Sequence, residues 1–189
     1  MITMQHIPVE LMFAMRKRYG LEQFIETGTY QGQSAMLATA QFDTVTTCDI
    51  DPAKIERWAG LQLPEPKRFI AICGNSPDVL RTILDDPACP PALVWLDAHW
   101  SGGPKLGPEC PLLDELRAIG GTRGRHVILI DDARLFENPP PPPHDPSQWP
   151  TFAQIEDVCR ELGPTDIMEV FGDVIVVRPQ KIPRCKGCR

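Results

Sequence analysis

Short apolar runs alternate with helical patterns along most of this chain. Apolar and β-branched runs that predict strands cover 21–27, 44–50, 68–73, 92–96 and 126–130. Helical patterns follow them at 33–40, 53–61, 112–119 and 152–162, and another helix is expected to begin after Ser76. Ser76 is the expected N-cap of that helix, with Pro77 at its first position. The alternation predicts repeated strand–helix units.

The middle strands are apolar on both faces, as in ALVWL at 92–96. Strands covered by helices on both faces form parallel sheets, so the pattern predicts an α/β fold with a doubly wound, mostly parallel sheet. The last two runs, 166–171 and 174–178, flank Gly172 and Asp173 and predict a hairpin. This hairpin adds an antiparallel edge to a seven-stranded sheet. We expect a single domain over 1–189, with a helical segment at 1–20 and a tail at 179–189.

The composition excludes several classes of partner. The chain has 189 residues, 42% hydrophobic and 23% charged, with a formal net charge of -6. It has no block of Lys or Arg, so we expect neither a nucleic acid nor a membrane as partner. His6, Pro8 and Glu10 interrupt the apolar residues of the N-terminus, which therefore lacks the pattern of a secretory signal. The seven cysteines lie mostly in apolar segments, which indicates a cytoplasmic protein with free thiols.

The first strand ends in a glycine-rich turn, FIETGTYQGQS, at 24–34. Ligands of doubly wound sheets bind at the carboxyl ends of the strands, near the point where strand order reverses, and we expect this turn there. Gly28 and Gly32 let the backbone turn sharply and approach a ligand. The dinucleotide pattern Gly-x-Gly-x-x-Gly is absent, and Glu26 would repel a pyrophosphate. Glu26 instead suits a ligand with a positive group, such as S-adenosylmethionine, which carries an ammonium and a sulfonium.

The next two strands provide further polar groups. Asp49 lies at the end of the second strand, roughly 20 residues after the glycine turn, a spacing typical of the acid that binds a ribose diol. Asn75 and Ser76 follow the third strand and could meet the edge of an adenine ring. The alternative is a glycine turn that serves packing alone.

These residues resemble a known family. Glu26-x-Gly28-x-Tyr30-x-Gly32-x-Ser34 resembles the first motif of class I S-adenosylmethionine-dependent methyltransferases, especially the catechol O-methyltransferase group, in which Tyr replaces the middle glycine. The segment VTTCDIDP around Asp49 resembles the second motif of that group. The resemblance covers about 24–178 and implies a Rossmann-like fold with S-adenosylmethionine as cofactor. The cofactor-binding residues that it implies are Glu26, Thr27, Gly28, Thr29, Tyr30, Gly32, Ser34, Asp49, Asn75, Ser76 and Asp97.

Three carboxylates are expected at neighbouring strand ends. Asp97 follows the fourth strand, and Asp131 and Asp132 follow the fifth. Adjacent carboxylates are costly unless a positive charge compensates them, and oxygen ligands suit Mg²⁺ or Mn²⁺. The resemblance to metal-dependent catechol and macrolide-sugar O-methyltransferases implies that these three aspartates bind the metal. The alternative is that Asp131 and Asp132 only cap a turn.

The resemblance implies that the chain transfers a methyl group to an oxygen. A metal would lower the pKa of the acceptor hydroxyl, and a base near Asp97 would take its proton. The catechol group has a lysine shortly after the fourth-strand acid, whereas here His99 is nearer and Lys105 lies farther on. His99 has a near-neutral reference pKa and is the first candidate base. Its alternatives are a structural role or a position against the adenine, and Trp100 is either a core residue or a wall of the substrate site.

Three further segments have open roles. The proline-rich segment at 138–146 is either a rigid connector or a wall over the site. The helix at 112–119 is expected to contribute to the core, with Asp114 and Glu115 facing solvent. Cys185 and Cys188 form a CxxC without a second pair, which favours an unstructured tail over a zinc site.

Together the residues predict an S-adenosylmethionine-dependent methyltransferase that uses a metal in the O-methylation of a small hydroxylated acceptor. We expect no large added substrate domain within these 189 residues. The N-terminal segment, the loop at 101–109 and the proline-rich segment are therefore expected to recognise the acceptor, unless a second copy in a homodimer completes the site. The rivals are a metal-independent N- or sugar methyltransferase and a non-catalytic nucleotide-binding module.

Overall fold

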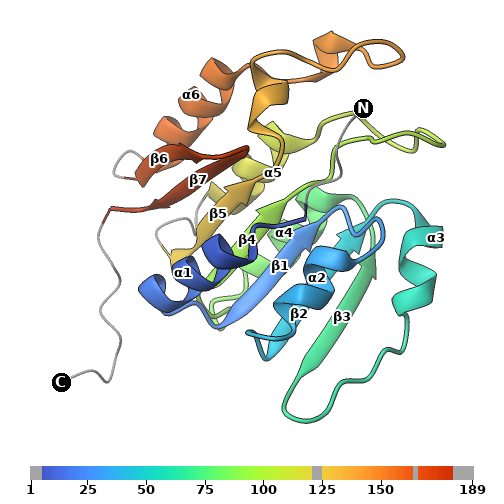
Figure 1. The fold of residues 1–189 in the computed structure, drawn as a ribbon, viewed down its shortest axis with the longest axis vertical. Coiled ribbons are helices and arrows are strands. Elements are labelled where there is room, and N and C mark those ends of the chain that lie inside the picture. The colour runs from blue at the N-terminus through green and yellow to red at the C-terminus, as the bar shows by residue number, and fades with distance from the viewer. Residues whose placement is uncertain (1–5, 121–124, 164–165, 181–189) are drawn as a thin grey trace.

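The computed structural model describes residues 6–120, 125–163 and 166–180. Strands and helices alternate along the described chain (Figure 1), as the sequence predicted. Their order is α1 (Val9–Tyr19), β1 (Gln23–Thr27), α2 (Gln33–Ala38), β2 (Thr44–Asp49), α3 (Pro52–Ile55), η1 (Glu56–Trp58), β3 (Arg68–Cys73), α4 (Ser76–Leu84), β4 (Ala92–Leu96), α5 (Leu112–Ile119), β5 (Val127–Ile130), η3 (Ala133–Phe136), η4 (Pro146–Gln148), α6 (Phe152–Leu162), β6 (Asp166–Phe171) and β7 (Val174–Pro179).

The described strands form one seven-stranded sheet in the order β3-β2-β1-β4-β5-β7-β6. Strands β1 to β5 pair in parallel, and β7 runs antiparallel to both β5 and β6. The predicted Rossmann-like sheet with an antiparallel edge is therefore confirmed. Strand order reverses at β1 and β4, and Thr27 pairs with Cys48 of β2 on one side and Leu96 of β4 on the other. Gly28, Asp49 and Asp97 therefore leave the sheet at the same level.

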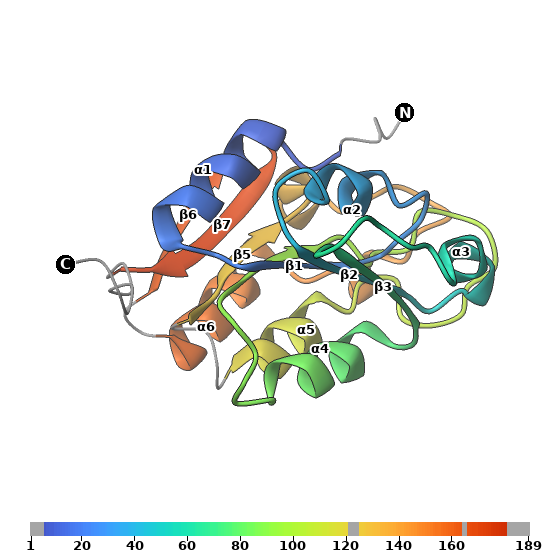
Figure 2. The ribbon, with the colours of Figure 1, turned by 90° about the horizontal axis from the view of Figure 1, so that it is seen from below.

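Helices cover both faces of the sheet. Figure 2 shows α1 and α2 on one face and α4, α5 and α6 on the other. Side chains alternate between the two layers along each strand, as strand geometry requires. On β1 and β4, Ile25 and Val94 pack with α4, α5 and α6, whereas Phe24 and Trp95 pack with α1 and α2. All four side chains are fully buried, so the strand ends that carry the polar residues rest on a rigid core.

Three helices differ from the predicted boundaries, and the first of them, α2, ends at Ala38 and not at residue 40. Helix α4 begins at Ser76, so Asn75 and not Ser76 is the N-cap residue, and the prediction was wrong by one position. The Asn75 side chain donates to Asp78 Oδ2 (3.0 Å) instead of capping a backbone N–H. The helix expected over 53–61 is shorter, because α3 becomes the 3₁₀ turn η1 and Gly60 then takes a left-handed φ of 79°.

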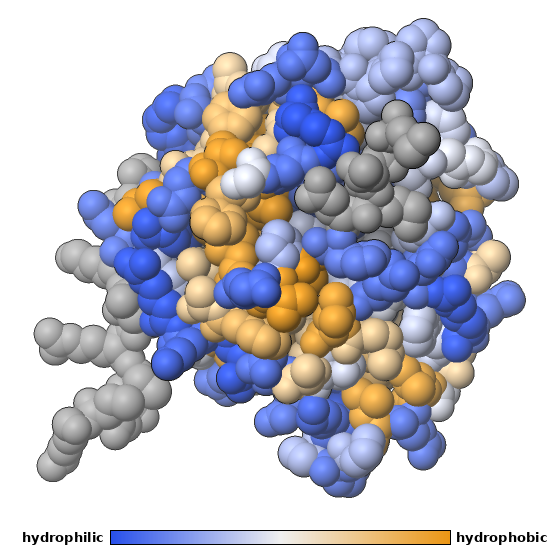
Figure 3. Space-filling view, viewed as in Figure 1, coloured by the Kyte–Doolittle hydropathy of each residue, from blue (hydrophilic) through white to orange (hydrophobic). Residues whose placement is uncertain are grey.

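The surface of the α1–α2 face is partly apolar. Figure 3 shows orange, hydrophobic atoms across the middle of this view and blue, hydrophilic atoms along its margins. Met36 and Leu37 of α2 are more than one-third exposed, and Phe171 at the end of the edge strand β6 is 60% exposed. Among the described residues, no helix combines the length and apolar character that crossing a bilayer requires.

Candidate functional site

A cavity of about 290 Å³ opens at the carboxyl ends of the parallel strands. Its size approaches the range of about 300 to 1,000 Å³ that is common for small-molecule sites. Most residues predicted to bind cofactor or to catalyse line it, namely Glu26, Gly28, Thr29, Tyr30, Gly32, Ser34, Asp49, Asn75, Ser76, Asp97, His99, Asp131 and Asp132. Thr27 and Lys105 are not among the lining residues. Trp100, for which the sequence left core or wall open, is part of the wall.

The turn after β1 brings its backbone unusually close to neighbouring segments. Gly28 has a φ of 82°, and a Cβ at this position would lie 2.1 Å from the carbonyl oxygen of Asp97. Gly32 has a φ of 71°, and its Cβ would meet the ring of Trp58 at 2.3 Å. Only glycine satisfies both the left-handed backbone and the close contact at these two positions. The two glycines therefore let the turn pack directly against Asp97 and the ring of Trp58.

Glu26 is a buried acid at the floor of the cavity. Its side chain is 2% exposed, and Thr47 Oγ1 donates to its Oε2 at 2.5 Å. Burial raises the pKa of Glu26 to about 8, although the hydrogen bond from Thr47 acts in the opposite direction. The carboxyl group is therefore mostly neutral at pH 7 in the absence of a ligand. A cationic group placed beside it would favour its ionised form, so the site is suited to a ligand with a positive charge.

Asp49 joins the turns that follow β1 and β2. Its Oδ2 accepts the backbone N–H of Tyr30 (3.0 Å), and its Oδ1 accepts that of Asp51 (2.9 Å). These bonds fix the carboxylate at the cavity wall, and each oxygen keeps a second lone pair for a ligand hydroxyl. Lys54 also lines the cavity, with its Nζ 4.3 Å from the centroid of the Tyr30 ring.

A second buried acid lies beneath this wall. Glu115 of α5 is 1% exposed, so the prediction that it faces solvent was wrong. The hydroxyl groups of Ser76 and Thr27 hydrogen-bond to it, while burial raises its pKa to about 7. Thr27 thus turns away from the cavity. The helical spacing contained the signal, because Glu115 lies between Leu112 and Ile119 on the apolar stripe of α5.

His99 occupies the centre of the predicted acid cluster. Its Nδ1 lies 3.4 Å from Asp97 Oδ1, and its Nε2 lies 3.1 Å from Asp132 Oδ2. The other oxygen of Asp132 pairs with the guanidinium of Arg134 at 2.6 Å. Asp131 Oδ1 accepts the backbone N–H of Asp132 (2.8 Å). One imidazole therefore bridges the acids at the ends of β4 and β5.

These contacts set the charges of the cluster. Burial opposes the charged form of His99, but Asp132 and Asp97 beside it raise its pKa to about 9. Burial raises the pKa of Asp97 well above its usual range, and it raises that of Asp131 to about 7 together with the charge of Asp132. Burial acts in the same direction on Asp132, but its bonds with His99 and Arg134 hold its pKa below the ordinary value. At neutral pH a cationic His99 therefore faces an anionic Asp132.

The arrangement does not fit the predicted metal site. Within the described ranges, no three His, Cys, Asp or Glu side chains converge as a set that could hold a metal ion. The oxygens of Asp97 and Asp132 that face the cluster are occupied by His99, and Arg134 takes the remaining oxygen of Asp132. Positive side chains thus supply the compensation that the sequence analysis assigned to Mg²⁺ or Mn²⁺.

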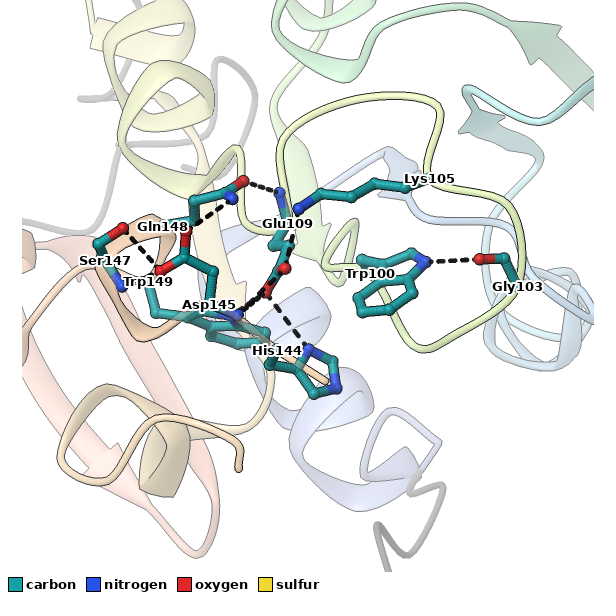
Figure 4. A network of polar contacts seen from close by, with 9 residues as sticks. All are labelled: Trp100, Gly103, Lys105, Glu109, His144, Asp145, Ser147, Gln148 and Trp149. Atoms are coloured by element: carbon teal, nitrogen blue, oxygen red, sulfur yellow. Dashed lines mark hydrogen bonds and ion pairs between the residues drawn. The ribbon is translucent and has the colours of Figure 1, made fainter. Parts of the chain in front are cut away.

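Two loops meet beside the cavity, as Figure 4 shows. Lys105, from the loop after β4, pairs its Nζ with Glu109 Oε1 at 2.9 Å. Glu109 also accepts the indole N–H of Trp149 and the backbone N–H of Asp145, both at 3.0 Å. The proline-rich segment therefore leads into a loop that is bound to the wall of the site. No periodic signal marks Glu109 or Trp149, because both lie outside regular helices and strands.

The cysteines take no part in the site as described, apart from a buried Cys48 in its wall. Cys48, Cys73, Cys89, Cys110 and Cys159 are free thiols, as expected. Cys185 and Cys188 of the CxxC lie outside the described residues.

Comparisons by sequence found no relative, since no family model and no curated protein matches the chain. Comparison of structures found proteins with the same fold. Human methyltransferase-like protein 13, solved with S-adenosylhomocysteine, is 13% identical with a TM-score of 0.54, and the match covers 87% of this chain and 76% of that one. A proposed caffeoyl-CoA O-methyltransferase from Staphylococcus aureus is 12% identical with a TM-score of 0.57, covering 93% and 83%.

A spermidine synthase from Thermotoga maritima is also similar, with 11% identity and a TM-score of 0.55 over 89% of this chain and 57% of that one. The likeness therefore concerns the fold, which is known to carry different reactions. This chain has the Rossmann-like fold of class I S-adenosylmethionine-dependent methyltransferases.

Proposed function

We propose that the chain binds S-adenosylmethionine and transfers its methyl group to an oxygen of a small hydroxylated molecule. The observation that carries this proposal is the buried carboxylate of Glu26, 2% exposed, at the floor of the cavity where strand order reverses. A neutral nucleotide would gain no charge interaction with such an acid. S-adenosylmethionine would lie at the carboxyl ends of the strands, where ligands of this fold usually bind, and its ammonium would pair with the carboxylate of Glu26.

Residues along the cavity fit successive parts of this cofactor. Glu26 would hold the ammonium group, and the free lone pairs of Asp49 would accept from the ribose hydroxyls. Asn75 and Ser76 lie at the wall after β3, where the adenine edge is expected. When bound, S-adenosylmethionine supplies a methyl group activated by its sulfonium. Gly28 contributes backbone alone to the lining of the cavity.

The acceptor side is formed by Asp97, His99 and Asp132. An acceptor hydroxyl placed beside this cluster could pass its proton to the carboxylate of Asp97, whose ionised form is favoured by the cationic His99 ring 3.4 Å away and whose raised pKa makes it a stronger base. Asp132 holds the opposite ring nitrogen and fixes the orientation of the imidazole. Trp100 supplies an apolar wall next to His99. The three residues therefore orient the acceptor and take its proton at one place.

Metal assistance is the part of the expectation that the donor geometry does not support. Binding Mg²⁺ through Asp97, Asp131 and Asp132 would require His99 to leave its bridging position and Arg134 to release Asp132. The proposed reaction accordingly uses no step through a metal. Turnover that persists in a chelator is the expected result, and turnover that depends on added Mg²⁺ would contradict this part of the proposal.

A transfer assay tests the function itself. The chain is incubated with S-adenosylmethionine and a panel of hydroxylated and amine-containing small molecules, and formation of S-adenosylhomocysteine is measured. We expect turnover with a hydroxylated acceptor and its loss in His99→Asn. Turnover only with amines would replace the O-methylation proposal by the N-methyltransferase alternative. Cofactor binding without turnover on any acceptor would favour a non-catalytic module.

A further inference from the structure

Glu109 is a buried carboxylate to which the mechanism above gives no role. Its side chain is 1% exposed, yet it lies in a loop between β4 and α5. Three donors bind its carboxylate: Lys105 Nζ on Oε1 (2.9 Å), Trp149 Nε1 on Oε2 (3.0 Å) and the backbone N–H of Asp145 between the two oxygens (3.2 and 3.0 Å). His144 Nδ1 lies 3.4 Å from Oε2. Figure 4 shows these partners converging on the one carboxylate.

The charge of Glu109 is well supported. Burial alone would raise its pKa, but the bonds from Lys105, Trp149 and the Asp145 backbone lower it to about 2. The group is therefore an anion at every physiological pH. Charge-assisted hydrogen bonds of this kind are stronger than neutral ones and fix their partners in place.

Two of its partners bear directly on the proposed site. Trp149, 4% exposed, packs its ring against that of His99 with centroids 5.4 Å apart, and its N–H is the one that Glu109 accepts. On the other side, Trp100 donates its backbone N–H to the carbonyl of Glu109 (2.6 Å), which closes the loop at 100–109 at its base. That loop contributes Ser101, Pro104 and Leu106 to the wall of the cavity.

We propose that Glu109 is a positioning residue that holds Trp149 against the His99 ring and joins the cavity-wall loop to the loop containing His144 and Asp145. Its role in catalysis rests on the function proposed above, because that function makes His99 the cationic partner of Asp97, which accepts the proton. The contacts of Glu109 with Trp149 and with the two loops do not depend on that function. Glu109 touches neither cofactor nor acceptor, and it acts on His99 only through the indole of Trp149.

Glu109→Gln is the sharpest perturbation. A glutamine amide has one acceptor oxygen and one NH₂ group, so the NH₂ must face a donor in either orientation. Trp149→Phe is the second variant, because it keeps an aromatic ring at the position beside His99 and removes the N–H that Glu109 accepts together with the second ring of the indole. Glu156→Gln, at an exposed position of α6, controls for the loss of one negative charge.

The readout is the nitrogen NMR spectrum of the histidine rings, together with titration by S-adenosylhomocysteine. The chain has only four histidines, His6, His99, His126 and His144, and His99→Asn assigns the signal of interest. His126 lies before β5, at the opposite end from the site, and serves as an internal control for folding.

We expect Glu109→Gln to shift the His99 ring signals, leave those of His126 in place and raise the dissociation constant of S-adenosylhomocysteine about 10-fold. Trp149→Phe should shift the His99 signals in the same direction, and Glu156→Gln should change nothing. A folded Glu109→Gln with wild-type His99 signals overturns the inference. If Glu109→Gln does not fold, unchanged His99 signals in Trp149→Phe overturn it. A wild-type chain that fails to bind S-adenosylhomocysteine refutes the proposed function, while the His99 signals still decide the role of Glu109.

Discussion

Glu26→Gln replaces the buried carboxyl group at the cavity floor by a neutral amide of the same size. In the wild-type chain burial raises the pKa of Glu26 to about 8, so most molecules are protonated there at pH 7. A ligand ammonium binds best to the ionised form. Binding must therefore remove the proton from Glu26, and the affinity for S-adenosylhomocysteine should rise with pH. The amide has no proton to release, so the variant should lack this part of the pH dependence.

The magnitude follows from the pKa of about 8. The ionised fraction of Glu26 is roughly 0.3% at pH 5.5 and roughly 9% at pH 7, which corresponds to an increase in affinity of about 30-fold. The ligand's own amino group remains largely protonated in this window, since α-amino groups have pKa values of about 7.7 to 8.0. At pH 7 binding should release about 0.9 proton per site, because roughly nine-tenths of Glu26 must ionise.

Calorimetry measures both quantities. Dissociation constants are compared at pH 5.5 and pH 7 for the wild-type chain and Glu26→Gln, and titrations in two buffers of different ionisation enthalpy give the number of protons released. Other groups that titrate in this range affect both proteins alike, so the difference between them isolates Glu26. A wild-type affinity that is flat with pH, or a variant with the same slope, would refute the assignment of the ammonium to Glu26.

Three further changes test other parts of the structure. Asp49→Ala should raise the dissociation constant of S-adenosylhomocysteine about 10-fold, because it removes ligand hydrogen bonds at the cavity wall, and should lower the melting temperature, because the backbone N–H groups of Tyr30 and Asp51 lose their acceptor; calorimetry showing wild-type affinity in the folded variant would count against the ribose role. Gly28→Ala would place a Cβ 2.1 Å from the Asp97 carbonyl oxygen, so we expect a large fall in the urea midpoint, and a wild-type midpoint would disprove the close packing. Burial, aided by the charge of Arg125, lowers the pKa of His126 from 6.5 to about 4, so folding keeps this ring neutral while the unfolded chain takes up a proton. The contribution of His126 to the free energy of unfolding is therefore fully present above pH 6.5. It falls by about 3 kcal/mol as the pH drops to 4. Urea unfolding of His126→Asn, which keeps an acceptor for the Ala92 backbone N–H, should lack this loss, and an unchanged pH dependence would exclude His126 as its source.

The sheet and its glycine turn could be predicted because their signals are local. Apolar runs bounded by Gly, Pro and Asp mark each strand, and a parallel sheet places all of its carboxyl ends at one edge. That rule alone brings Asp49, Asp97 and Asp131 to the same cavity as Glu26. The start of α4 could not be predicted to the residue, because Asn75 and Ser76 are both good cap residues.

The chemistry of the acid cluster could not be predicted in the same way. Sequence order places His99 near Asp97, but the rotamer that also brings its Nε2 to Asp132 depends on packing against Trp149, 50 positions farther along the chain. The sequence therefore indicated uncompensated acids and favoured a metal, whereas the folded chain compensates them with His99 and Arg134. Lys105 shows the same limit, because its pairing with Glu109 depends on the conformation of the loop that contains both residues.

The burial of Glu115 could have been predicted from the sequence. A charged residue was assigned to solvent by its type, although its helical position placed it on the buried stripe. Periodicity is the stronger guide here. Position 115 lies on the apolar stripe of α5, and the hydroxyl groups of Ser76 and Thr27 give the buried acid hydrogen-bond partners.

A titration of the wild-type chain with S-adenosylhomocysteine at pH 7, without added metal, tests most directly whether the cavity at β1 and β4 is a cofactor site. We predict binding of one molecule per chain, with proton release, and weaker binding by Glu26→Gln and by Asp49→Ala. Absence of binding, or binding that neither substitution weakens, would contradict the assignment of this cavity to S-adenosylmethionine.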